Sequence, residues 1–341
     1  MLDQSSPEIR FALHAVRQAS LLVREIQKGL VSSALTKDDR SPVTVADFAS
    51  QALVSYLLAE TFPYDPLVAE ENSTTLRNSD ANETISANIL DKVTHFLSLF
   101  APRATPQLVC DWIDRGCADS ARRFWTLDPI DGTKGFLRGD QYVVALALIV
   151  DGKVQIGALG CPKLTDAHRP DMSGPGCIVI SARNQGAWTT PLAFSSDDPH
   201  RQHLIPLRVS PQINPEQARL LCSFESEHTN VGQIEAFAQT LGIQAEPVRM
   251  DSQVKYAVLA AGKGELLLRL LSPSKPNYQE KIWDQAAGSL ILEEAGGRIT
   301  DLDGKPLDFQ TGRTLVQNRG ILASNGALHR LALQALQEMA A

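Results

Sequence analysis

The segment Leu127-Asp128-Pro129-Ile130-Asp131-Gly132-Thr133 places two carboxylates three residues apart, with a proline between them. The side chains of Asp128 and Asp131 and the carbonyl of Ile130 can converge on a hard divalent cation such as Mg²⁺. Gly132 allows a close turn, and a helix starting after it would favour an anion beside the metal. The segment therefore predicts phosphate chemistry, although Asp, Pro and Gly also favour a plain surface turn.

Two other acidic segments strengthen this interpretation. The run Val68-Ala69-Glu70-Glu71-Asn72 follows apolar residues and can end a strand in a carboxylate. The run Trp283-Asp284-Gln285-Ala286-Ala287-Gly288 opens an amphipathic helix. There Asp284 can either point at a metal or serve only as the N-cap of the helix, which is the ordinary role of Asp at that position.

Taken together, the three segments resemble the lithium-sensitive, magnesium-dependent phosphatase superfamily that includes inositol monophosphatase. Its pattern is G-E-E, then D-P-[IL]-D-G-T, then W-D-x-A-A-G, and this chain carries all three in that order, with Ala69 where the family usually has Gly. The resemblance implies an α/β fold with an α+β first part, built as a layered αβαβα sandwich with two sheets between helix layers.

Within this superfamily the chain is most similar to the 3'(2'),5'-bisphosphate nucleotidases of fungi and plants, over roughly residues 10 to 335. The segments that carry this likeness are Ser41–Asp47, Arg123–Trp125, Lys134–Gly139, Asp251–Tyr256 and Tyr278–Asp284. These enzymes remove the 3'-phosphate of adenosine 3',5'-bisphosphate (PAP) in sulfur assimilation, and many also act on its sulfated relative PAPS. The resemblance implies a small-molecule nucleotide substrate.

The same resemblance assigns roles in the reaction. Two or three Mg²⁺ ions would be held by Glu70, Asp128, the carbonyl of Ile130, Asp131 and Asp284. Asp47 and Thr133 match the pair that activates the attacking water, with the carboxylate accepting the proton through the hydroxyl. Without the resemblance, Asp47 would be an N-cap of a helix over 47–60 and Thr133 a cap on the following turn.

Substrate contacts are expected from both parts of the chain. His228, Ser252, Lys255 and Arg269 match positions that contact the nucleotide, and Lys and Arg can pair with a second phosphate. The plainer alternatives place His228 in a polar loop, Lys255 on the wet face of a helix and Arg269 at a strand end. The substrate would also meet the residues of the metal side, which are Asp131, Gly132, Thr133 and Asp284.

Bulk properties narrow the class of protein. A chain of 341 residues favours two domains, which we place at 1–205 and 206–341. The net charge of −7 without a long basic run argues against nucleic-acid binding. The longest apolar run, 142–150, is too short for a bilayer, and no secretory signal is visible. Five cysteines without C-x-x-C spacing indicate a reducing compartment, so we expect the cytoplasm, or cytoplasm and nucleus. We also expect a monomer.

Hydrophobic periodicity predicts the order of the elements. The expected helices are 8–30, a second from Asp47, 86–100, 231–241, 252–261, 284–295 and 325–339. The expected strands are 142–150 and 154–161 with a hairpin at Asp151-Gly152, a second hairpin near 179–188, and 219–223, 246–249, 265–270 and 297–300. Stretches 71–83 and 101–120 are expected as surface loops, and 190–217 as the crossover between the domains.

Three other functions compete with the bisphosphate nucleotidase. A phosphatase of the same fold acting on inositol phosphates or sugar bisphosphates is the nearest, and the Asp251–Lys255 segment argues against it. A catalytically inactive metal or nucleotide sensor is the second, and the full set of carboxylates with Thr133 argues against that. A purely structural interaction protein is the third.

Overall fold

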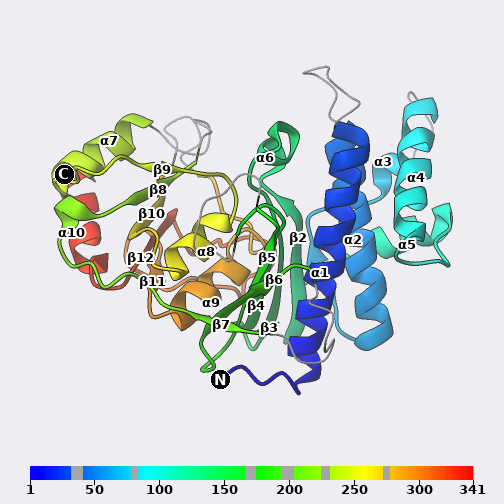
Figure 1. Cartoon of the computed structure of the whole chain (residues 1–341), viewed down its shortest axis with the longest axis horizontal. Helices are drawn as coiled ribbons and strands as arrows, with labels where there is room; N and C mark the ends of the chain where they lie inside the picture. Colours follow the sequence, from blue (N-terminus) through cyan, green and yellow to red (C-terminus); the bar gives the residue numbers. More distant parts are fainter. Residues whose placement is uncertain are drawn as a thin grey trace.

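The molecule is built in five layers (Figure 1). Helices α1 (Pro7–Ile26) and α2 (Ser41–Thr61) cover one face of a seven-stranded sheet, and α8 (Val254–Ala260) and α9 (Ala286–Glu294) cover the other. A five-stranded sheet follows, and α7 (Val231–Thr240) and α10 (His329–Ala340) cover its outer face. The computed structural model describes residues 1–31, 41–77, 83–165, 174–193, 203–223, 231–271 and 277–340. The layered αβαβα fold is confirmed.

The first sheet is antiparallel except at one edge, and its strands follow one another in chain order. Strand β1 (Leu67–Ala69) pairs in parallel with β2 (Arg123–Asp131), and the rest pair antiparallel. These are β3 (Val143–Val150), β4 (Lys153–Cys161), β5 (Cys177–Ala182), β6 (Ala187–Pro191) and β7 (Ile205–Leu207). The predicted β3–β4 hairpin is confirmed, with positive φ at both Asp151 (50°) and Gly152 (70°), as a tight two-residue turn requires.

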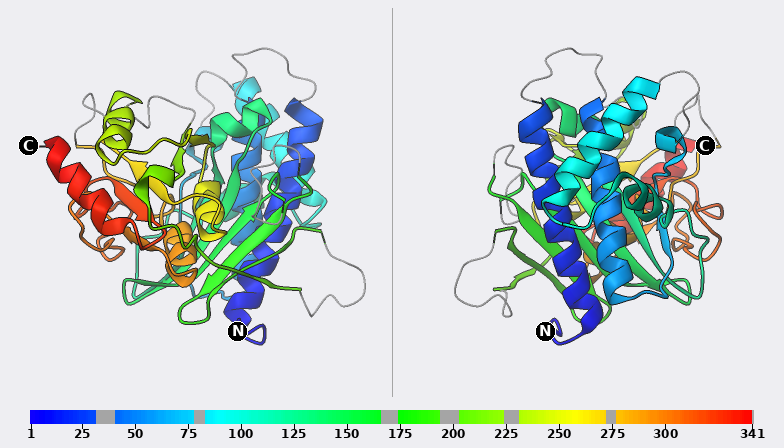
Figure 2. Two further views of the ribbon diagram at one scale, coloured as in Figure 1. Left: turned by 60° about the vertical axis from the view of Figure 1, so that its left-hand side comes forward. Right: turned by 90° about the vertical axis from the view of Figure 1, so that its right-hand side faces the viewer.

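Strand β3 shows why the run at 142–150 is apolar without alternation. Val144, Leu146 and Leu148 belong to the core beneath α1 and α2, while Val143, Ala145, Ala147 and Ile149 belong to the core shared with α8 and α9. Successive side chains of a strand point to opposite faces, so a sheet buried on both faces needs apolar residues at every position. The second view in Figure 2 shows the helices lying across this sheet.

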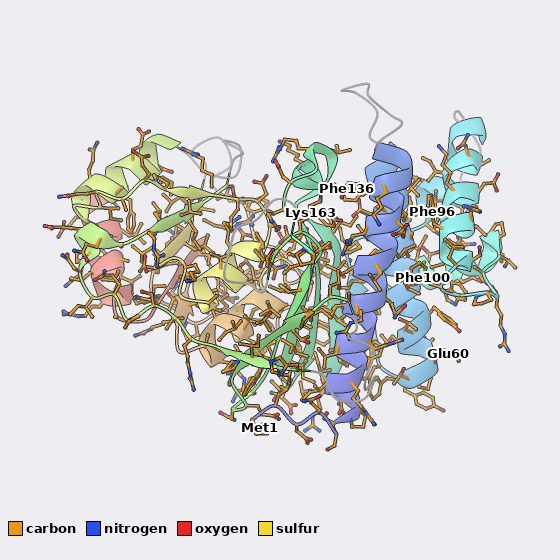
Figure 3. All side chains as sticks on the ribbon, viewed as in Figure 1. Met1, Glu60, Phe96, Phe100, Phe136 and Lys163 are labelled. Carbon is orange, nitrogen blue, oxygen red and sulfur yellow. The ribbon has the colours of Figure 1, made fainter. Side chains whose placement is uncertain are left out.

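The second sheet has the order β11-β12-β10-β8-β9 and is mixed. Its strands are β8 (Leu220–Cys222), β9 (Val248–Arg249), β10 (Leu266–Arg269), β11 (Arg298–Thr300) and β12 (Ile321–Ser324). β8 pairs in parallel with β9 and β10, while β12 runs antiparallel to β10 and β11. Side chains fill the space between the layers (Figure 3).

Three predictions of local structure were wrong. α2 begins at Ser41 rather than at Asp47, so Asp47 lies inside the helix and is not its N-cap. The stretch 101–120 contains α5 (Pro106–Asp114), because Thr105 caps Leu108 N, Pro106 starts the helix, and three residues on one side are buried. The expected loop at 71–83 contains α3 (Thr74–Arg77), and α4 (Glu83–Ser98) follows it.

The structure also contains two short helical elements that were not predicted. A π-helical turn, Gln27–Val31, continues α1, and α6 (Thr133–Arg138) follows β2 directly. The described residues contain no helix with the length and apolar character needed to cross a membrane.

Candidate functional site

A bulge in β2 brings the two carboxylates of the Asp-Pro-Ile-Asp segment to one face of the sheet. Asp128 pairs with Ala145 and Asp131 with Val143, so three steps along β2 match two steps along β3. In a regular strand, residues three apart point to opposite faces, and one extra residue restores them to the same face. Pro129 has no N–H to leave unpaired at this irregularity. The bulge therefore directs both carboxylates toward α8 and α9.

Helix α2 supports this bulge and the acidic pair at the end of β1. The hydroxyl of Ser50 donates to the carbonyl of Pro129 at 2.9 Å. The side-chain amide of Gln51 donates to the carbonyl of Glu71 at 2.7 Å, and its oxygen accepts from Glu71 N at 2.9 Å. Two neighbouring residues of one helix thus hold two of the three acidic segments at fixed positions.

Glu70 directly follows β1, as predicted, at a point where the chain is held on both sides. Ala69 N donates to the carbonyl of Gly116 at 2.8 Å, and the Arg313 guanidinium donates to the carbonyl of Ala69. Ala69 is buried and does not adopt a positive φ, so the backbone before Glu70 does not require the glycine that is usual there.

Asp284 lies two residues before α9, and the N-cap of that helix is Gln285. The alternative role of Asp284 as the N-cap is therefore wrong. Gln253 fixes this segment, because its amide donates to the carbonyl of Trp283 at 3.0 Å and its oxygen accepts from Gly288 N at 3.1 Å. The Gln253 main-chain N–H donates to Asp131 Oδ2 at 2.6 Å. Gln253 therefore links Asp131 of the first sheet to the Asp284 segment.

The carboxyl groups are close enough to perturb one another. Burial, followed by the negative charges of Glu70, Asp131, Asp284 and Asp47, raises the pKa of Asp128 well above its ordinary value. Burial and the charges of Glu71 and Glu70 raise the pKa of Asp47 in the same direction. The structure thus gathers all five acidic residues that the sequence singled out.

Glu70 sits at the rim of this group and is exposed. Loss of hydration among the surrounding side chains, and then the charges of Glu71 and Asp131, raise the pKa of Glu70 to about 7, while Lys281 opposes the shift. One side of Glu70 faces water, which screens part of this repulsion.

The oxygen atoms gathered at this site are of the kind that binds a hard divalent cation. Carboxylate oxygens and a main-chain carbonyl are the ligands that Mg²⁺ selects, and a bound cation would relieve the repulsion that raises these pKa values. Across the described ranges, however, no three acidic, histidine or cysteine side chains are spaced to hold an ion as they stand. The five carboxyl groups are therefore neighbours in electrostatic reach, and their side chains would have to converge further around a metal.

Gly132 and Ser252 lie against each other where the two sequence halves meet at the site. Gly132 has a φ of 93°, and a Cβ there would lie 2.9 Å from Ser252 Cβ. Ser252 itself has a positive φ of 67°, unusual for a residue with a side chain. Thr133 is the exposed first residue of α6 and not its cap, and in the described part of the chain no hydrogen bond joins it to Asp47.

Two cations face the carboxylates from the second half of the chain. Lys255 is buried, with Nζ 3.1 Å from Ser223 Oγ and 3.2 Å from the carbonyl of Met250, so its expected alternative on a wet helix face is wrong. Burial, opposed by Asp131, lowers the pKa of Lys255 to about 8. Arg269 ends β10, as predicted, and its positive charge acts on both Asp131 and Asp284.

A hydrogen-bond network that sequence reasoning missed fixes Arg269. Arg269 Nε donates to Glu280 Oε1 at 3.1 Å, Glu280 Oε2 accepts from the Gln285 amide at 2.9 Å, and Gln285 Oε1 accepts from the Tyr256 hydroxyl at 2.5 Å. Glu280, Gln285 and Tyr256 all lie in the segments that carry the family resemblance, and this was the one feature of the sequence that could have pointed to them. His228 lies outside the described residues.

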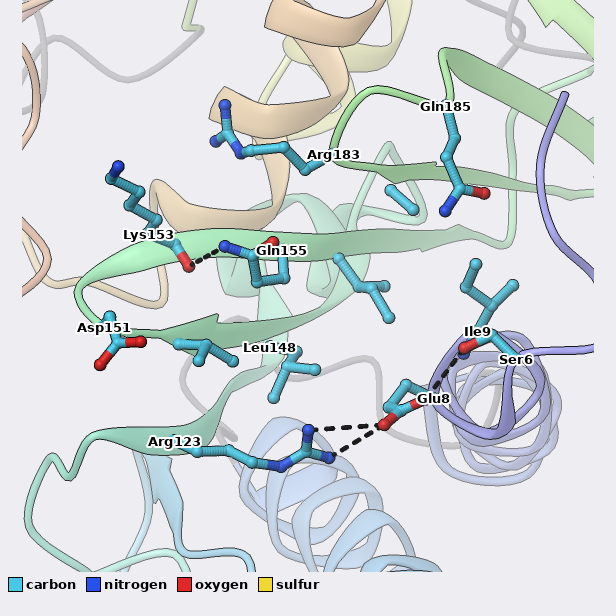
Figure 4. A pocket seen from close by; sticks show the side chains of 13 residues that line it. Ser6, Glu8, Ile9, Arg123, Leu148, Asp151, Lys153, Gln155, Arg183 and Gln185 are labelled. Atoms are coloured by element: carbon cyan, nitrogen blue, oxygen red, sulfur yellow. Dashed lines mark hydrogen bonds and ion pairs between the residues drawn. The ribbon is translucent and has the colours of Figure 1, made fainter.

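A surface cavity of about 640 Å³ lies elsewhere on the molecule (Figure 4). Its lining includes Glu8, Arg123, Asp151 and Lys153. Arg123 is the first residue of β2 and Asp131 the last, so this cavity lies at the opposite end of that strand from the carboxylates. It contains none of the predicted site residues.

Comparison with known proteins agrees with this arrangement. The family model described as inositol monophosphatase family matches residues 4–341. A 3'(2'),5'-bisphosphate nucleotidase of Schizosaccharomyces pombe is 41% identical, covering 96% of this chain and 94% of the relative. A probable 3'(2'),5'-bisphosphate nucleotidase 4 of Arabidopsis thaliana is 40% identical, covering 97% and 94%.

A solved structure gives the same fold. Inositol monophosphatase II from Staphylococcus aureus superposes with a TM-score of 0.62 at 18% identity, covering 98% of this chain and 94% of that one. With the whole-length family match and the fungal and plant relatives, the chain belongs to the inositol monophosphatase family and, within it, groups with the 3'(2'),5'-bisphosphate nucleotidases.

Proposed function

We propose that this protein is a magnesium-dependent phosphatase that removes the 3'-phosphate of PAP to give AMP, and that it also acts on PAPS. The observation that carries the proposal is one juxtaposition: carboxyl groups that include the buried Asp47 and Asp128 face two cations, the buried Lys255 and the partly buried Arg269, whose charges reach Asp131. A bisphosphate needs both, because one phosphate requires metal ions and the other requires cationic side chains. The names of the fungal and plant relatives support the same substrate.

Two or three Mg²⁺ ions are assigned to the oxygens of Glu70, Asp128, Ile130, Asp131 and Asp284. When bound, they would cancel the charge of the phosphate dianion and lower the pKa of an attacking water. Small monovalent lithium would compete for such a position without supplying the second charge, so we expect stronger inhibition by lithium than by potassium at equal ionic strength. The bulge in β2 and the Gln253 link keep the protein ligands on one face for this purpose.

Asp47 and Thr133 are assigned to the water. The Thr133 hydroxyl is exposed at the start of α6 and can orient a water molecule, and a carboxylate behind it can take the proton. Asp47 is suited to accept a proton, since burial and the charges of Glu71 and Glu70 raise its pKa. Gly132, the N-cap of α6, and Thr133, its first residue, would also contact the scissile phosphate.

The nucleotide is assigned to the second half of the chain. Arg269 and Lys255 would bind the 5'-phosphate, while Ser252 and His228 would contact the nucleoside. Ser252 lies against Gly132, which places this part of the substrate directly beside the metal ligands. The division of the chain at residue 205 into a metal-binding and a nucleotide-binding domain remains part of this proposal. A monomer in the cytoplasm or nucleus, serving sulfur assimilation, completes it.

The test is phosphate release from a panel of five substrates with magnesium present. The panel holds PAP, PAPS, inositol 1-phosphate, inositol 1,4-bisphosphate and fructose 1,6-bisphosphate. We expect the highest kcat/KM on PAP, with PAPS next. A higher kcat/KM on an inositol phosphate would replace the nucleotide by an inositol substrate, and no turnover on any of the five would favour a binding protein.

A further inference from the structure

Arg313 occupies an unusual position between the two sequence halves. Its guanidinium donates to the carbonyl of Ala69 and, from Nη1, to the carbonyls of Gly116 (3.4 Å) and Ala118 (3.3 Å). The same group lies over the ring of Trp283, 4.9 Å from its centre. One side chain thus contacts β1, the loop after α5, and the segment before α9.

The main chain of Arg313 is anchored as well. Its carbonyl accepts from Ile282 N at 3.1 Å, and the next residue, Thr314, forms an isolated β-bridge with Lys281. Arg313 is therefore attached through its backbone to the 281–283 segment and through its side chain to β1. The hydrogen bond between Arg313 and Ala69 joins residues that are 244 positions apart in the sequence.

Two residues that Arg313 contacts directly precede assigned metal ligands. Ala69 precedes Glu70, and Trp283 precedes Asp284. Glu70 follows β1 of the first sheet, whereas Asp284 lies just before α9 in the second half of the chain. A change in the distance between Ala69 and Trp283 would therefore change the distance between these two carboxylates.

We infer that Arg313 is a positioning residue that sets the spacing of Glu70 and Asp284 across the site. The inference rests on the proposed metal-dependent function. The guanidinium suits this role because it is planar, so its face can stack on Trp283 while its edge donates to several carbonyls. A lysine at this position would have one ammonium group to replace three donor contacts and a stacking face.

The experiment compares Arg313→Met and Arg313→Lys with wild type. Mn²⁺ binding to the metal-free proteins is measured by calorimetry, and phosphate release from PAP is measured as magnesium is raised. We expect about 10- to 100-fold weaker Mn²⁺ binding in Arg313→Met, the size typical for outer residues that orient metal ligands. Arg313→Lys should recover only part of the lost Mn²⁺ affinity. The concentration of magnesium for half-maximal rate should rise by a similar factor, with KM for PAP at saturating magnesium unchanged.

Arg319→Met is the matched control, since Arg319 lies six residues further along the chain, is exposed and forms an ion pair with Asp303 at 3.1 Å. Thermal unfolding without metal reports whether each variant is folded. If Arg313→Met does not fold, Arg313→Lys is used to test the inference. Wild-type Mn²⁺ affinity in both Arg313 variants, or an equal loss in Arg319→Met, would overturn the inference alone. Absence of Mn²⁺ binding by wild type would overturn the proposed function and this inference together.

Discussion

The two sides of the site handle buried charge in opposite ways. On the side of the first sheet, Asp47 and Asp128 are buried beside other carboxyl groups, and their pKa values are raised. On the side of the second sheet, Arg269 is paired with Glu280 at 3.1 Å, and Lys255 donates to Ser223 and Met250. The neighbouring charges that shift the pKa values of Asp47 and Asp128 are all negative, whereas the basic side is held by its own hydrogen bonds.

This difference separates two functions of the residues. Repelling carboxylates are costly to keep ionised until a cation binds, so the acidic side couples stability to metal. The basic side is already oriented before a ligand arrives, so it should govern substrate choice with less effect on metal binding. Changes to the two sides should therefore produce different patterns of loss.

The largest effect is expected from Asp131→Asn on the acidic side. Losing one ligand charge should reduce turnover beyond the roughly 100-fold that outer residues around a metal can cost. The metal-free protein should be no less stable than wild type, because the substitution removes a repelling charge and asparagine can still accept the Gln253 N–H. Phosphate release and thermal unfolding without metal test both parts. Turnover within tenfold of wild type at ordinary magnesium would contradict the assignment.

Arg269→Ala should affect the basic side selectively. A charge-assisted hydrogen bond to the 5'-phosphate contributes about 1.5–3 kcal/mol, or roughly ten- to a hundredfold in kcat/KM for PAP. Activity on adenosine 3'-monophosphate, which lacks that phosphate, should fall much less. Because the change leaves the buried Glu280 without its cationic partner, unfolding must be measured alongside. Equal losses on both substrates would show that Arg269 does not bind the 5'-phosphate.

The pH dependence should separate Lys255 from the carboxylates. Burial lowers its pKa to about 8, so its positive charge is lost as pH rises through that value. We expect kcat/KM for PAP to fall above about pH 8 by up to about tenfold per pH unit, as for a single proton. Lys255→Met should start lower and show no fall in this window. An identical alkaline fall in both proteins would assign it to another group.

The smallest effect concerns stability without substrate. The pKa of Glu70 rises from an ordinary 4.5 to about 7, so the folded state holds more protons than the unfolded state between these values. Stability of the metal-free protein should therefore decrease as pH rises through this window. Magnesium at a hundred times its Kd should add about 2.7 kcal/mol above about pH 7, and less at lower pH, where Glu70 is protonated in the metal-free folded state. Unfolding curves at about pH 5.5 and 7.5 measure this, and an equal gain at both would refute the coupling.

Much of the fold followed from the sequence because its signals are local. The apolar run of β3 and the Asp151-Gly152 turn each depend on neighbouring residues. β2 was not predicted, because a proline argues against a central strand. The structure resolves this by placing Pro129 in the bulge, where no strand hydrogen bond from its nitrogen is needed.

The site was less predictable where it depends on packing. The residue types around Asp128 and Asp284 indicated metal chemistry, but nothing local indicates that a bulge aligns Asp128 with Asp131. Lys255 is buried because every residue of α8 is buried, so that helix has no wet face. Arg313 gave no local signal at all, since its partners lie far away in sequence and meet it only in the folded chain.

The middle layer of helices also limits how the enzyme can move. α9 lies so close to β4 that a Cβ on Gly157 would meet the Ala287 carbonyl at 2.6 Å, and one on Gly288 would meet the Tyr256 ring at 2.2 Å. α8 and α9 share one hydrophobic core with side chains of both sheets, among them Ala145 of β3 and Leu267 of β10, so this layer joins the two sheets. Substrate entry and product release would then proceed by local rearrangement of loops and side chains around a rigid centre, and not by opening and closing of two lobes.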